Sequence, residues 1–104
     1  MNFGSKLYME ERRDRERPEK REEIACDCWF CSTGRMIPRF LKYRDKEGMI
    51  HQIGNIEVLK AYDRRYCGIR VKEYVCRTVQ DGRETGFTLY FNQEECRWKL
   101  KWRK

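Results

Sequence analysis

Residues 74–91 read YVCRTVQDGRETGFTLYF, and this stretch decides the fold. Strand-like alternation runs on both sides of Asp81-Gly82, which is typical of two antiparallel strands joined by a two-residue turn. Gly82 readily adopts the positive φ that such a turn requires, and Asp81 tolerates it. The turn predicts three opposed pairs: Thr78 with Thr85, Cys76 with Phe87, and Tyr74 with Leu89.

A second turn, at residues 92–95, extends this hairpin into a three-stranded meander. It predicts three further pairs: Phe91 with Cys96, Leu89 with Trp98, and Phe87 with Leu100. The two turns were placed independently, yet both put Phe87, Leu89 and Phe91 on one face. The same face receives Tyr74, Cys76, Trp98, Leu100 and Trp102. Agreement between separate local signals is what a specified fold should show, so we expect this face to be the core.

The segments upstream of the meander also favour strands. Residues 36–44 read as a strand that Pro38 confines to an edge or a strand start, residues 45–48 as a turn, and residues 49–53 as a short return strand. Residues 56–66 fit either a helix or a strand, and we prefer a strand because the neighbouring segments are strands. We therefore predict a single, mainly β domain over residues 24–104, a small antiparallel sheet or partly open barrel.

Residues 1–23 differ in composition from the rest. Charged residues are 39% of the chain and mean hydropathy is −1.00, so part of it is expected outside the fold. Residues 10–23 have no apolar side chain that could offset the entropy of ordering. The segment 1–23 balances seven basic against seven acidic residues, which favours a disordered, solubilising arm over a tail that binds an acidic partner.

Three cysteines fall within six residues, at Cys26, Cys28 and Cys31. Together with Gly34 they resemble one half of a zinc knuckle, and we predict a cysteine knuckle at residues 26–34 on the N-terminal side of the domain. A full zinc ribbon would carry a second Cys-x-x-Cys about 15–20 residues later, and this chain has none. We expect a structural zinc ion held by Cys26, Cys28, Cys31 and Cys67.

Other roles for these cysteines stay open. His51 is the alternative fourth ligand, and Cys76 is expected to pack in the core as a small hydrophobe. The cluster could also be three unliganded thiols, or a redox pair, although Asp27 opposes the lowered thiol pKa that redox chemistry needs. No apolar run is long enough to span a membrane, and residues 1–9 lack the apolar core of a signal peptide. We therefore expect a cytoplasmic protein with reduced thiols.

The surplus of positive charge lies in the predicted domain, which has 17 basic and 10 acidic residues. Residues 97–103 alternate strictly, with apolar side chains on one face and four cations on the other. Those four, Arg97, Lys99, Lys101 and Arg103, are candidates for contacting a phosphate backbone. The competing explanation is an edge strand that uses cations to prevent aggregation. The exposed pair Trp29 and Phe30 could stack on bases or cover the metal.

These patterns predict a small basic binding module that contacts nucleic acid through its C-terminal strand. The alternative is a protein–protein adaptor with no nucleic-acid role. Catalysis is not expected, because the chain has no Gly-rich phosphate loop, no paired histidine motif and only one histidine. Neither a membrane nor a small-molecule cofactor is implied.

Overall fold

The computed structural model describes residues 21–103 as seven strands and the turns between them. The strands are β1 (Glu22–Phe30), β2 (Met36–Arg44), β3 (Ile50–Ile53), β4 (Glu57–Tyr66), β5 (Ile69–Gln80), β6 (Arg83–Asn92) and β7 (Arg97–Trp102). The mainly β prediction is confirmed, and the ambiguous segment 56–66 is a strand. Within the described residues, no helix is long and apolar enough to cross a membrane.

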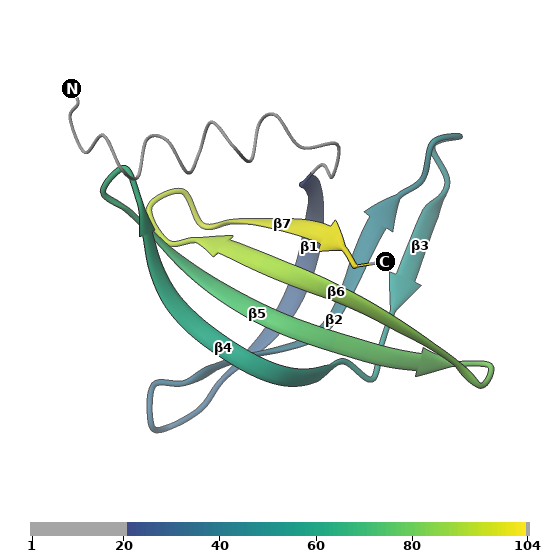
Figure 1. The fold of residues 1–104 in the computed structure, drawn as a ribbon, viewed down its shortest axis with the longest axis horizontal. Helices are drawn as coiled ribbons and strands as arrows, with labels where there is room; N and C mark the ends of the chain where they lie inside the picture. The colour runs from purple at the N-terminus through teal and green to yellow at the C-terminus, as the bar shows by residue number, and fades with distance from the viewer. Residues whose placement is uncertain (1–20, 104) are drawn as a thin grey trace.

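The strands form one antiparallel sheet in the order β3-β2-β1-β7-β6-β5-β4. Strands that follow one another in the chain are paired, except β3 and β4, and β7 returns to pair with β1. The sheet curls as a strongly bent, open layer whose free edges are β3 and β4 (Figure 1). This arrangement is the predicted small antiparallel sheet, left open between its two edge strands.

The core lies on the inner, concave side of the curled sheet. Its buried members are Leu41, Ile53, Tyr74, Cys76, Phe87, Leu89, Trp98 and Leu100. Two hydrogen bonds tie opposite parts of the sheet together across this interior. The Tyr74 hydroxyl donates to the backbone oxygen of Met36 (3.1 Å), and the Thr78 hydroxyl donates to that of Gly54 (2.8 Å). They hold β5 against β2 and against the connection between β3 and β4.

The β5–β6 hairpin has the predicted register, with Thr78 opposite Thr85 and Cys76 opposite Phe87. The predicted β6–β7 register is wrong by two residues. The structure pairs Phe91 with Trp98, Leu89 with Leu100 and Phe87 with Trp102. A shift of two residues keeps every side chain on the same face, so the predicted core face is nevertheless correct.

The geometry of the β6–β7 turn explains that shift. The side-chain oxygen of Asn92 accepts hydrogen bonds from the amides of Glu94 (2.9 Å) and Glu95 (3.0 Å). Cys96 then takes a positive φ of 56°, and its amide bonds the backbone oxygen of Asn92 at 2.7 Å. The turn therefore includes Cys96, and Arg97 is the first residue to pair, opposite Asn92.

The first strand begins at Glu22, two residues before the expected start of the domain. Glu22 and Glu23 pair with Leu100 and Lys99 of β7. A strand can extend into charged residues here, because Glu23 and Lys99 are opposite charges facing one another across the pair. The rest of the predicted arm, residues 1–20, lies outside the described residues.

Candidate functional site

The basic strand β7 lies inside the sheet, between β1 and β6. The explanation of its cations as protection for an edge strand is therefore wrong. That explanation assumed that the last strand of the meander would be an edge, but pairing with β1 removes the edge. Edge protection therefore does not explain why cations line the outer face of β7.

Several cations gather on the outer face of three adjacent strands, β2, β1 and β7. We define the basic face as Lys42, Arg44, Arg97, Lys99 and Lys101. The register places them on the side opposite the core, because Lys42 and Arg44 flank the inward Tyr43, and Lys99 flanks the buried Trp98 and Leu100. All except the half-buried Lys101 are exposed.

Among residues 21–103, few acidic groups lie on the same side as the basic face. Glu23 and Asp27 of β1 point to the same side, at alternating positions with the inward Ile24, Cys26 and Cys28. Glu23 reaches Arg97 only at 4.0 Å, and both side chains are largely exposed, so this ion pair contributes little. The face therefore keeps a net positive charge.

The sequence analysis missed Lys42 and Arg44 as members of this face. The alternation of residues 36–44 carried the signal, because it puts both cations on one side of the predicted strand. What it could not supply was the pairing of β1 with β7, which brings β2 close to the C-terminal strand.

Arg103 does not belong to the basic face as predicted. Its amide bonds the backbone oxygen of Gly86 (3.0 Å), and its guanidinium lies over Gly86 and donates to the backbone oxygen of Cys76. This cation is engaged in tying β7 to β6 and β5. We therefore assign Arg103 a structural contact.

An exposed aromatic lies on the same outer side. Trp29, near the end of β1, is 58% exposed and follows Asp27 at the next outward position. The guanidinium of Arg39 lies 4.5 Å from the centre of its ring. Arg39 is the extra residue of a bulge, because Asp27 pairs with Phe40 while Cys28 pairs with Pro38. This bulge accompanies a cation over an aromatic ring on the same side of the sheet as the basic face, beyond Asp27 along β1.

The thiols of Cys26 and Cys28 are the pair that the structure brings together. Both point to the inner side of β1 and pack against the core, with sulfur atoms 4.0 Å apart. The two thiols share a hydrogen bond in which either sulfur can be the donor. This contact raises the pKa of Cys26 and lowers that of Cys28, and burial raises the Cys26 pKa further. Asp27, between them, points to the outer side.

The other two predicted zinc ligands lie elsewhere. Cys31 closes the β1–β2 turn, where its backbone oxygen accepts from Gly34 (2.8 Å). Cys67 lies with a φ of 52° in the β4–β5 turn, and Figure 1 shows these two turns at different ends of the molecule. Residues 21–103 contain no group of three or more His, Cys, Asp or Glu residues placed to hold a metal. The four-cysteine zinc site stays a prediction that this arrangement does not assemble.

Cys76, expected in the core, and His51, the alternative fourth ligand, both have structural roles. Cys76 is fully buried, as predicted, and burial raises its thiol pKa to about 12. His51 hydrogen-bonds the Asp45 carboxylate (2.7 Å), which lowers the pKa of Asp45, and its ring stacks on Tyr43. His51 therefore helps to hold the β2–β3 turn.

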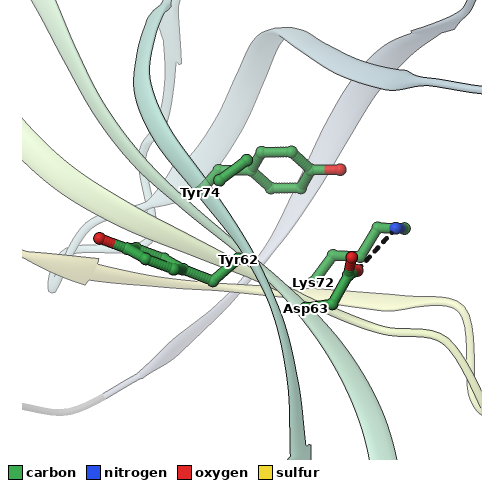
Figure 2. Close-up of a pocket in the computed structure, with 5 residues that line it drawn as sticks. Tyr62, Asp63, Lys72 and Tyr74 are labelled. Carbon is green, nitrogen blue, oxygen red and sulfur yellow. Dashed lines mark hydrogen bonds and ion pairs between the residues drawn. The ribbon is translucent and has the colours of Figure 1, made fainter.

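A small open pocket lies on the inner side of β4 and β5 and is lined in part by Asp63, Lys72 and Tyr74. Figure 2 shows Asp63 and Lys72 joined by an ion pair of 2.9 Å, while Tyr62 points the opposite way from Tyr74. The volume of the pocket is about 80 Å³, far below the 300–1,000 Å³ of typical ligand sites. The pocket is too small to bind a substrate-sized molecule.

Comparisons with protein-family models, curated proteins and solved structures return no match for this chain. No residue role is therefore carried over from a relative. The basic face and the thiol pair are assigned from the geometry of this chain alone.

Proposed function

We propose that the protein is a binding module for single-stranded nucleic acid, and that the basic face contacts the phosphate backbone. The observation that supports this most directly is the position of β7. Its cations lie in the middle of the sheet, on the same side as Lys42 and Arg44 of β2 and separated from them by β1, where they have no role in protecting an edge. Clustered cations on one face are the electrostatic footprint of a phosphate-binding surface.

A single strand fits this surface better than a duplex. Proteins that bind single strands combine a cationic surface with aromatic side chains on which bases stack. Trp29 supplies such a ring on the same side of the sheet as the basic face, farther along β1, and Arg39 adds a cation over it. Within residues 21–103, the face belongs to a curved sheet from which no helix protrudes that could enter a major groove.

The proposed role is binding without catalysis, in a reducing compartment such as the cytoplasm. The six cysteines all lie in the described part of the chain and form no disulfide there, which suits such a compartment. The pocket between β4 and β5 is too small for a substrate, and the proposal therefore rests on the outer surface.

The test is the affinity of the full chain for fluorescently labelled oligo(dT) and oligo(U), followed by anisotropy at several salt concentrations. If all five cations contact phosphates, the log–log salt slope should be about −3.5, since a single strand contributes about −0.7 per contact. The double variant Lys42→Gln/Lys99→Gln should bind more weakly and reduce the slope by about 1.4.

A matched control removes the same charge elsewhere. Lys60→Gln/Arg83→Gln changes two exposed cations in β4 and at the start of β6, outside the basic face. It should leave both affinity and slope close to those of the parent chain. Equal losses in the two double variants would show only non-specific charge attraction. No binding by the parent chain at low salt would overturn the proposal and favour the protein–protein adaptor.

A further inference from the structure

The inner side of β1 carries two sulfur donors in apolar surroundings. Cys26 lies opposite Leu41 and Cys28 opposite Pro38, and both thiols pack against the hydrophobic core. Asp27 points away from them, and in the described part of the chain no third carboxylate, imidazole or thiol completes a metal-holding group. The pair therefore provides two sulfur donor atoms to a metal ion, and the described residues around it provide no third donor.

The separation of the sulfur atoms limits what they can bind. With a metal–sulfur bond of about 2.3 Å, two sulfurs lie about 3.8 Å apart at a tetrahedral angle, about 4.0 Å apart at 120° and about 4.6 Å apart on a straight line. The observed 4.0 Å lies within this range, so one ion can bridge the two sulfurs. No backbone movement is needed to reach it.

A disulfide fits the same pair less well. Alternate residues of a strand have Cα atoms about 6.6 Å apart, close to the upper limit of about 6.8 Å for a disulfide. The sulfurs would also have to move from 4.0 Å to about 2.05 Å. Such a bond would be strained and readily reduced, so chelation is the easier use of this pair.

We propose that Cys26 and Cys28 chelate one copper(I) ion. Soft thiolate ligands select copper(I), whereas a structural zinc ion requires four ligands, two more than this pair provides. The reaction is a ligand exchange: two copper–glutathione bonds break, the released glutathione thiolates take the protons of the two cysteine thiols, and two copper–cysteine bonds form without change of oxidation state. The third position is left for an external thiol such as glutathione.

Two further features suit this chemistry. The two sulfur atoms already face one another on the inner side of β1, in hydrogen-bonding contact at 4.0 Å. Both cysteines are half-exposed, so an ion can reach them from solvent. Neither cysteine belongs to the basic face, so the site is independent of nucleic-acid binding.

The experiment delivers copper(I) as its glutathione complex to the reduced full chain under nitrogen, with a chromophoric copper(I) chelator as competitor. We expect one copper per chain and a sulfur-only shell of three ligands in X-ray absorption. Cys26→Ser and Cys28→Ser should each weaken binding by more than about 100-fold, since loss of a mere supporting partner already costs 10–100-fold.

Cys96→Ser is the matched control, because Cys96 is the exposed thiol of the β6–β7 turn, and it should bind like the parent chain. A readout without mutation is alkylation mapped by mass spectrometry, in which copper(I) should protect Cys26 and Cys28 but not Cys96. The proposal is overturned if copper(I) is retained by the Cys26→Ser/Cys28→Ser variant, if those two cysteines remain unprotected, or if zinc binds the pair more tightly than copper(I).

Discussion

Arg103 lies directly over Gly86, and its guanidinium reaches across that glycine to the backbone oxygen of Cys76. A Cβ at position 86 would lie 2.5 Å from a guanidinium nitrogen of Arg103. Because Gly86 has no side chain, Arg103 can lie against the outer surface of β6. From there it links β7 to β6 and β5. This contact explains why a glycine occupies position 86 within strand β6.

The contact predicts that the effect of Gly86→Ala on the free energy of unfolding changes sign when Arg103 is removed. Arg103→Ala should lower the free energy of unfolding by about 1–2 kcal/mol, through loss of a charge-assisted hydrogen bond. Gly86→Ala alone should also destabilise, because it displaces the guanidinium. In the Arg103→Ala background the same change should instead stabilise by about 0.5–1 kcal/mol, the usual gain of Ala over Gly within a strand. Urea denaturation measures all four corners of the cycle.

Additive effects would contradict the contact, since residues that share an interaction give non-additive free energies. The same variants also separate structure from binding. Arg103→Ala should leave the salt slope of nucleic-acid binding unchanged, whereas a slope reduced by about 0.7 would return Arg103 to the phosphate-binding set.

A second prediction concerns the core face of the meander. Leu89 is fully buried, between Tyr74 of β5 and Leu100 of β7. Leu89→Ala should cost about 2–5 kcal/mol, as expected when a buried leucine leaves a cavity. Lys99→Ala, on the opposite face of the sheet, should stay within about 0.5 kcal/mol. Thermal and urea unfolding distinguish the two, and equal costs would contradict the assignment of faces.

The meander could be predicted from the sequence because each turn there has its own local signal. Asp81-Gly82 fixed the β5–β6 register, and both residues take a positive φ in the structure. The β6–β7 turn depends on Cys96 in a left-handed conformation, which is unusual for a non-glycine residue and left no trace in the pattern. The closure of β7 onto β1 joins segments far apart in sequence, and no local signal reports it.

The candidate site could be predicted only in part, for the same reason. The sequence predicted a cysteine knuckle over residues 26–34, whereas the structure has Cys26 and Cys28 within strand β1, on one face. Whether Cys67 lies near them depends on where the β4–β5 turn falls in the curled sheet, which spacing cannot indicate. Likewise, the alternation of residues 97–103 could not show that Arg103 bends over Gly86.

A third prediction concerns acid pH at the β2–β3 turn. Asp45 accepts hydrogen bonds from His51 and from the amides of Met49 and Glu47, and these lower its pKa, the His51 contact most. A depressed pKa means that this contribution to stability is present above the ordinary Asp value and is lost as pH falls through the folded value. Carbon NMR titration of the Asp45 carboxyl should show the low pKa.

His51→Phe keeps an aromatic ring to stack on Tyr43 but removes the hydrogen bond to Asp45. In that variant the pKa of Asp45 should rise toward its ordinary value. It should stay somewhat below that value, because the bonds from Met49 and Glu47 remain. An unchanged Asp45 pKa would show that the His51 contact is not formed in solution.

The last prediction concerns alkaline pH and Tyr74, which joins β5 to β2 across the interior. Its hydroxyl donates to the backbone oxygen of Met36 (3.1 Å), and burial raises its pKa to about 12. Tyr74→Phe removes this bond and should cost about 0.5–1.5 kcal/mol near neutral pH.

Because the pKa of Tyr74 is raised in the folded state, its contribution to stability is fully present below the unfolded value of about 10. This contribution is lost as pH rises toward 12. The parent chain should therefore lose its advantage over Tyr74→Phe between these values, in urea denaturation at stepped pH. Tyr62→Phe, which changes a more exposed tyrosine, should follow the parent chain throughout. Parallel curves for the parent chain and Tyr74→Phe would show that Tyr74 is not buried as a neutral hydroxyl.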